Sequence, residues 1–377
     1  MSDQVITLLK DLVAIDSVNP SLVPGAAGEA EIAAAIGAHM RALGLDVEVQ
    51  EVVPGRPNVI GVLEGTEPGR TLMLCGHVDT VGVDGMHAPF DPVERNGLLY
   101  GRGAQDMKAG VAAMIDAARV ARDSGFRKGR LVIAAVVDEE YASIGADALV
   151  TAWQADAGIV TEPTDLQIGV GHKGFAWAEI ETRGVAAHGS RPADGRDAIL
   201  RMGRVLQRLE ALGRRLQARP AHPVMGCGSL HASIIQGGRE ISSYPASCRL
   251  QVERRTIGGE AAEDFVEEIE EILRALKLDD PEFKASASLM FARPSYEVPP
   301  ESELPAALAQ AARASGTNAI TTGLSFWTDA AILGQAGIPS VLFGPGGAGL
   351  HSSEEYVRIA EVVSCRDTLA SLALNWL

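Results

Sequence analysis

Three short, continuous apolar runs, at 71–75, 131–137 and 158–160, constrain the fold of this chain most strongly. Such runs lack the alternation of a strand with one wet face, so they are typical of strands buried on both sides. Between the first two lies 107–122, where apolar residues recur at helical spacing. Strands that alternate with helices in this way predict an α/β domain with a mostly parallel sheet.

The pattern changes after Gly174 and returns beyond Pro294. Within 175–292, half-exposed strand patterns and helical patterns follow one another in the order β-α-β-β-α-β, which is typical of a small α+β module. We therefore expect an α/β domain over 1–174 and 293–377, interrupted by an inserted domain over 175–292. A length of 377 residues suits two domains.

The same patterns predict the remaining elements. Helices are expected at 1–15, 29–43, 198–218, 260–276, 303–315 and from about 357. Strands are expected at 47–53, 58–63, 176–182, 229–235, 247–254, 283–290 and 340–343.

Composition excludes several classes of function. A formal net charge of −16 argues against a nucleic-acid partner, which would require a basic face. No apolar run approaches the roughly 20 residues of a membrane span. The first 15 residues fit an amphipathic helix better than a signal peptide, and four scattered cysteines suit a reducing compartment. We therefore expect a cytoplasmic protein without a membrane partner.

Polar residues follow the apolar strands directly. His77 and Asp79 come after 71–75 and point to the same side of an extended backbone. A nearby carboxylate commonly orients a metal-bound imidazole. Asp106 stands at the start of the helix predicted for 107–122, where an N-cap is the alternative role.

Two further acidic sites and one histidine also follow predicted strands. Asp138-Glu139-Glu140 follows 131–137, Glu162 follows 158–160, and His351 follows the strand at 340–343 after a glycine-rich segment. Adjacent acids at the edge of a core repel one another unless cations compensate, although a solvated surface turn is the alternative. Because α/β proteins build their sites at strand ends, these residues together suggest a zinc or cobalt pair that shares a carboxylate.

The segments GHVDTV, GRGAQDMK, DEE, TEPT and GPGG…H carry a specific resemblance, in order and in approximate spacing. The chain resembles the M20 family of aminopeptidase-like zinc hydrolases, which includes acetylornithine deacetylase, succinyl-diaminopimelate desuccinylase, aminoacylase and glutamate carboxypeptidase. The lid segment GVAAHGSRP at 184–192 also matches, so the resemblance spans nearly the whole chain. It implies a zinc-exopeptidase-like catalytic domain with an inserted lid and dimerisation domain.

The resemblance also implies a set of metal ligands. His77 and Glu162 would complete one metal site, and Glu140 and His351 the other, with Asp106 bridging. Two divalent ions would be bound, with zinc as the first expectation and cobalt or manganese as alternatives.

Catalytic roles follow from the same resemblance. Glu139 would be the general base that takes a proton from the attacking water and passes it to the leaving amine. Asp79 would orient His77. His188, in the lid segment, would stabilise the oxyanion, often across a dimer interface in related enzymes.

Substrate contacts are implied at three positions. Arg255 would pair with a substrate carboxylate as a planar fork, and Thr328 and Asp329 would line the active site. The chain departs from the family at Ser242, because an asparagine usually stands three residues before the lid proline, here Pro245. That departure bears on substrate detail and not on the reaction class.

The expected function is hydrolysis of the amide bond of an N-acyl amino acid, as in acetylornithine deacetylation, by a homodimer that pairs through the lid. Short peptides are the alternative substrates, through carboxypeptidase or dipeptidase action, and desuccinylation of a diamino acid is a third possibility. An inactive metal-binding scaffold is the alternative outside catalysis. Gly344, Gly346 and Gly349 satisfy a dinucleotide-binding pattern, but too little chain follows for a second βα unit.

Overall fold

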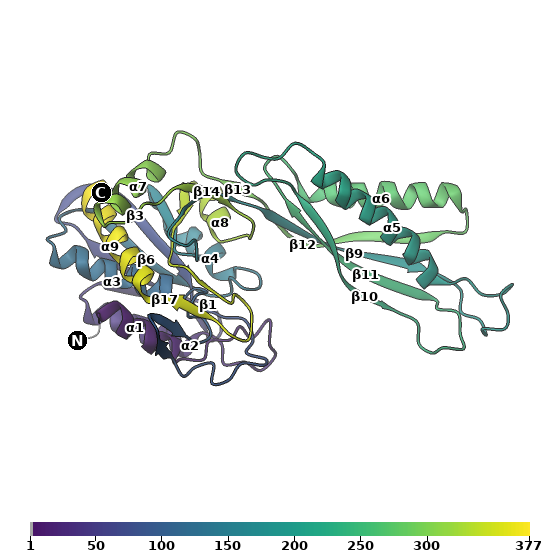
Figure 1. Cartoon of the computed structure of the whole chain (residues 1–377), viewed down its shortest axis with the longest axis horizontal. Coiled ribbons are helices and arrows are strands. Elements are labelled where there is room, and N and C mark those ends of the chain that lie inside the picture. The colour runs from purple at the N-terminus through teal and green to yellow at the C-terminus, as the bar shows by residue number, and fades with distance from the viewer. Residues whose placement is uncertain (1–2) are drawn as a thin grey trace. The chain divides into compact units, whose positions relative to one another are not determined.

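The computed structural model describes residues 3–377, so the first two residues of the helix predicted for 1–15 lie outside the described part (Figure 1). The chain divides into two compact units. Unit 1 comprises the chain up to Val170 together with Val298–Thr322 and Thr328–Leu377, and unit 2 comprises Gly171–Glu297 and Gly323–Trp327.

Unit 1 is built on a mixed β-sheet. Its strands, in spatial order, are β1 (Asp46–Val53), β2 (Arg56–Glu64), β6 (Lys128–Val136), β3 (Glu67–His77), β7 (Ala157–Val160), β15 (Ser340–Leu342) and β8 (Ile168–His172). The last two residues of β8, Gly171 and His172, belong to unit 2. The four central strands β6, β3, β7 and β15 are parallel to one another, whereas the β1–β2 and β2–β6 pairs and the β15–β8 pair are antiparallel. The α/β class is confirmed, and the predicted parallel arrangement describes the centre of the sheet.

Helices cover this sheet on both sides. They are α1 (Gln4–Val13), α2 (Ala30–Ala42), α3 (Lys108–Asp123), α4 (Ile144–Ala152), α7 (Leu304–Ala314), α8 (Ala330–Gln335) and α9 (Ile359–Trp376). The alanine-rich α3 is almost completely buried, because it packs between the sheet and α1 and α9. Successive residues of β3 and β6 are buried on both faces, as continuous apolar strands require.

A second, smaller sheet in unit 1 was not predicted. It consists of β16 (Gly347–Ala348), β17 (Tyr356–Arg358), β5 (Leu98–Tyr100) and β4 (Val93–Arg95). Strands of two or three residues are too short to show alternation, which explains why the sequence pattern did not indicate them. This sheet connects the chain around Tyr100 to the chain around Tyr356, whose rings lie 5.2 Å apart.

Unit 2 contains a four-stranded antiparallel sheet with two helices on one face (Figure 1). Its strands, in spatial order, are β10 (Ser229–Gly237), β11 (Ser247–Thr256), β9 (Gly174–Arg183) and β12 (Lys284–Arg293). The helices α5 (Ala198–Gln217) and α6 (Ala262–Asp279) bury their apolar faces against the sheet in a separate core. Two short strands, β13 (Tyr296–Glu297) and β14 (Thr321–Leu324), pair with β8.

The register of the parallel strands positions the polar residues that follow them. His77 pairs with Val136, and Cys75 pairs with Val160. The carboxyl ends of β3, β6 and β7 therefore lie at one edge of the sheet, where the residues after Val136 and Val160 meet His77.

Candidate metal centre

His77 lies at the end of β3 with its imidazole almost completely buried. Its Nδ1 is 2.9 Å from the main-chain carbonyl oxygen of Asp79 and 3.6 Å from the Asp79 carboxylate. An Nδ1–H that donates to this carbonyl leaves Nε2 with a free lone pair, the form in which an imidazole binds a metal. Nε2 lies 3.1 Å from Oδ1 of Asp106.

Asp106 lies between two histidines. Its Oδ1 faces Nε2 of His77, and its Oδ2 is 3.4 Å from Nε2 of His351. His351 Nε2 also lies 3.3 Å from Oε2 of Glu140. A carboxylate with one oxygen toward each histidine has the geometry needed to bridge two ions.

Two groups of side chains among residues 3–377 bring ligand atoms within 4.8 Å of one another. One comprises His77, Glu139 and Glu162, and the other comprises His77, Asp106 and Glu140. In the first group, Nε2 of His77 is 3.9 Å from a carboxylate oxygen of Glu139 and 3.9 Å from one of Glu162. The structure therefore brings all five predicted ligands together, with Glu139 beside them.

Without a cation beside them, the ionised forms of the three glutamates in this cluster are destabilised. Burial, together with repulsion from Glu162, raises the pKa of Glu139 well above its usual value. Burial likewise raises the pKa of Glu162, and burial with repulsion from Asp106 raises that of Glu140. Nearby cations reverse this effect, because they stabilise the ionised carboxylates.

The pKa values of the two histidines are also raised, because the surrounding carboxylates stabilise the charged imidazolium form. Hydrogen bonds with Asp106 and Glu140 raise the pKa of His351 to about 10. Burial works to raise the pKa of Asp106, but its hydrogen bonds with His351 and His77 outweigh burial and lower it. The cluster therefore binds positive charge strongly, whether that charge is a proton or a metal ion.

The donor set fits divalent ions. It combines two imidazoles with four carboxylates in a largely buried site, and Oε1 of Glu140 is buried without a hydrogen-bond partner among residues 3–377. Mixed nitrogen and oxygen ligation suits zinc, cobalt or manganese. An acidic site of this kind is expensive to bury unless cations neutralise it.

Comparison with known proteins agrees with this geometry. Residues 73–375 match the model of peptidase family M20/M25/M40. The chain belongs to this family. It is accordingly a metal-dependent hydrolase that acts on amide or peptide bonds, as the cluster indicates.

Individual relatives of this M20 chain cover nearly its full length. It is 34% identical to an acetylornithine deacetylase of Myxococcus xanthus over 96% of this chain and 94% of that protein. It is 29% identical to an N-formyl-4-amino-5-aminomethyl-2-methylpyrimidine deformylase of Bacillus subtilis (strain 168), over 99% of this chain and 95% of that protein. A dinuclear metal-binding M20 peptidase of Bacillus subtilis has the same fold, with a TM-score of 0.76 and 18% identity. The match covers 99% of this chain and 97% of that peptidase.

One buried acid in this M20 chain was not singled out from the sequence. Glu355 is fully buried, and its carboxylate accepts backbone N–H groups from Gly103, Gln105 and Asp106 at 2.8–3.1 Å. Arg102 donates to the same carboxylate at 2.6 Å. Glu355 therefore holds the loop that presents Asp106, and no sequence pattern around it indicated this role.

The predicted substrate residues lie in different units. Thr328 and Asp329 belong to unit 1 and are buried, and Asp329 contributes to the raised pKa of Glu139 through charge repulsion, after burial and Glu162. His188 and Arg255 belong to unit 2. His188 Nδ1 is 2.8 Å from the Ser190 hydroxyl, in the loop after β9.

Arg255 already has partners within unit 2. Its guanidinium forms an ion pair with Glu253 and lies 5.6 Å from the centre of the Phe175 ring. A cation held over an aromatic face in this way is oriented before any ligand arrives.

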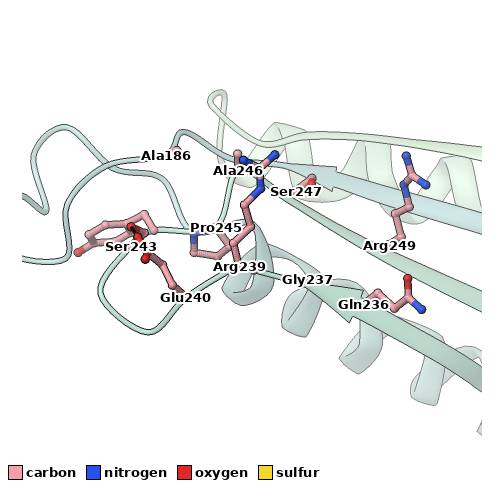
Figure 2. A pocket seen from close by; sticks show the side chains of 12 residues that line it. Ala186, Gln236, Gly237, Arg239, Glu240, Ser243, Pro245, Ala246, Ser247 and Arg249 are labelled. Atoms are coloured by element: carbon pink, nitrogen blue, oxygen red, sulfur yellow. Dashed lines mark hydrogen bonds between the residues drawn. The ribbon is translucent and has the colours of Figure 1, made fainter.

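Unit 2 also contains a cavity of about 530 Å³, lined by Ala186, residues 236–240 and 243–247, and Arg249 (Figure 2). Two arginines, Arg239 and Arg249, contribute to its polar lining. None of the predicted site residues lines this cavity.

Proposed function

We propose that this M20 hydrolase removes a small acyl group from the amine of an amino acid, with acetylornithine-type deacetylation as the first candidate. The observation that carries the proposal is the cluster in which Asp106 lies between His77 and His351 beside Glu139. Two relatives that span nearly the whole chain are named as a deacetylase and a deformylase. Both names describe cleavage of a short acyl group from nitrogen.

We propose the same metal ligands that the resemblance to the family implies. His77 and Glu162 would hold one ion, Glu140 and His351 the other, and Asp106 would bridge them; zinc is proposed, with cobalt and manganese as alternatives. When bound, such ions polarise the amide carbonyl and make water a stronger nucleophile at neutral pH.

Glu139 is proposed as the general base. Its carboxylate lies 3.9 Å from Nε2 of the proposed ligand His77 and is largely shielded from solvent, so it is placed beside the ligand cluster, where it would take a proton from the attacking water. The same carboxyl then protonates the leaving amine, which completes the hydrolysis with no net proton change at Glu139. Burial and the neighbouring Glu162 raise the pKa of Glu139, and nearby cations would lower it again, so the carboxyl can both accept and return a proton.

Two residues of unit 2 complete the proposal. His188 would donate a hydrogen bond to the tetrahedral oxyanion, and Arg255 would bind the substrate carboxylate by exchanging its ion pair with Glu253. Asp79 would orient His77, and Thr328 and Asp329 would line the substrate site. Unit 2 is proposed to be the inserted lid and dimerisation domain, through which the chain pairs as a homodimer.

The setting of the reaction is proposed as the cytoplasm, with a small N-acyl amino acid or short peptide as the substrate and no nucleic acid as a partner. No helix among residues 3–377 is long and apolar enough to cross a membrane.

A substrate panel tests the proposal. The protein loaded with zinc, cobalt or manganese would be assayed against N-acetylornithine, an N-formyl amine, N-succinyl-diaminopimelate and dipeptides. The proposal predicts the highest kcat/KM for the N-acetyl or N-formyl substrate. Faster turnover of dipeptides would assign a peptidase instead, and metal binding without turnover of any substrate would assign a scaffold.

A further inference from the structure

We propose that Asn19 is a positioning residue for the turn that carries Glu139 and Glu140, and that it acts through the carboxylates of Asp79 and Asp138. The inference rests on the proposed function, because it concerns the general base and one metal ligand of that reaction. Asn19 itself touches none of the proposed ligands through its side chain.

The side chain of Asn19 is fully buried between two carboxylates. Its Nδ2 donates to Oδ2 of Asp79 at 2.8 Å and to Oδ1 of Asp138 at 3.1 Å, so both amide hydrogens are used. Its Oδ1 accepts the backbone N–H of Ser21 at 2.8 Å, and its own N–H donates to the Thr80 carbonyl at 2.9 Å. The three side-chain bonds leave the amide a single orientation, because the reversed amide would place its oxygen against two carboxylates.

The Asp79 carboxylate connects Asn19 to the turn. Oδ1 of Asp79 accepts the backbone N–H of Glu139 at 3.1 Å, and Oδ2 accepts that of Glu140 at 3.1 Å. One side chain thus holds two successive backbone amides, and it determines where the two glutamate side chains begin. This contact is closer than the 3.6 Å between the Asp79 carboxylate and His77 Nδ1.

Asp138 secures the same turn from its other end. Its backbone has a φ of 70°, a left-handed conformation in which aspartate is tolerated better than most residues. Its Oδ2 accepts the N–H of Ala142 at 3.2 Å, and its Oδ1 forms an ion pair with Arg56 at 2.8 Å. Arg56 is in turn paired with the buried Glu29, so the anchor behind Asp138 is itself fixed.

The charges explain why an amide is needed at this position. Asp79, Asp138 and Glu29 are all buried, and the guanidinium of Arg56 pairs with two of them. Asn19 supplies a neutral pair of donors between Asp79 and Asp138, which otherwise face each other as like charges. Without those donors the two carboxylates would separate or recruit water, and the backbone of Glu139 would move with them.

The decisive experiment compares Asn19→Asp and Asn19→Ala with Thr182→Val. Asn19→Asp keeps the shape but replaces the donor with an acceptor, and Asn19→Ala removes the contact. Thr182→Val removes a different buried side-chain hydrogen bond, from Thr182 Oγ1 to the Ala198 carbonyl in unit 2. For each protein, kcat, KM, bound metal, thermal unfolding and the visible absorption spectrum of the cobalt(II)-loaded form would be measured.

The proposal predicts that kcat falls by about 100-fold in both Asn19 variants, because a displacement of a catalytic group by about 1 Å lowers the rate by that factor. KM and the number of ions bound at saturating cobalt(II) should stay near wild-type values, and the cobalt(II) bands should shift because the proposed ligand Glu140 is displaced. Thr182→Val should change thermal unfolding alone. Asn19 variants that resemble Thr182→Val, with a lower Tm but unchanged kcat and spectrum, would overturn the proposal.

The spectrum separates this inference from the proposed function. If wild-type protein hydrolyses no substrate of the panel, the proposed function fails, but the cobalt(II) bands still report the position of the turn. Unchanged bands in both Asn19 variants would then overturn the positioning role by themselves.

Discussion

The carboxylate of Glu355 accepts the backbone N–H of Asp106 at 3.1 Å. The loop with the proposed bridging ligand is therefore held by an acid four residues beyond His351, another proposed ligand. We expect Glu355→Gln to weaken metal binding by about 10- to 100-fold, as loss of a residue that supports a ligand commonly does. Competition with a chromophoric zinc chelator measures this change.

The neighbouring Glu354 provides the matched control, because it is exposed. Glu354→Gln should leave zinc affinity unchanged. Equal zinc affinities in the two variants would show that the hydrogen bonds of Glu355 do not hold the Asp106 loop in the metal-binding position.

His172 in unit 2 predicts a pH dependence of stability. Burial lowers the pKa of His172 to about 4, below its ordinary value near 6.5. The unfolded chain therefore binds a proton as the pH falls through 6.5, while the folded chain stays neutral until about pH 4. Wild-type protein should lose up to about 3 kcal/mol of unfolding free energy over this interval through His172.

A His172→Phe variant should not show that loss. Urea unfolding at pH 7, 5.5 and 4.5 compares the two proteins, and the carboxylates that also titrate contribute equally to both. If the unfolding free energies of wild type and His172→Phe fell equally with pH, the claim that His172 is neutral when buried would be contradicted.

Gly110 in α3 allows a close approach between the helix and the end of β7. A Cβ at this position would lie 2.0 Å from the Thr161 carbonyl oxygen, one residue before Glu162. We expect Gly110→Ala to destabilise unit 1 by at least about 1–3 kcal/mol, the usual cost of overpacking a core. Thermal unfolding measures the change.

Gly203 in α5 is the control, since a Cβ there meets no atom within 4 Å. Gly203→Ala should be neutral or stabilising by up to about 1 kcal/mol, because alanine is the better helix former. A Gly110→Ala protein as stable as Gly203→Ala would mean that α3 does not lie so close to β7.

The sequence predicted the centre of the sheet because its strands are continuous apolar runs, and polar residues that end such strands meet at one edge. His77, Glu140 and Glu162 could be found in this way. The short strands around Tyr100 and Tyr356 could not, because two or three residues show no periodicity.

The roles of Asn19 and Glu355 could not be predicted, for a different reason. Asn19 contacts Asp138 across 119 positions, and Glu355 contacts Asp106 across 249. Asn19-Pro20 indicates a turn by local chemistry, and nothing local distinguishes Glu355 from any other acid in a loop. Only the paired strands and loops bring these side chains to their carboxylate and amide partners.

The relationship between the metal cluster and Glu139 is tested most directly by Glu139→Gln. This change keeps the size of the side chain but removes its ability to accept and return a proton. With N-acetylornithine and zinc-loaded protein, we predict that kcat falls by about 100- to 10,000-fold while two ions remain bound. A Glu139→Gln enzyme that binds both ions and hydrolyses the substrate as fast as wild type would contradict the account.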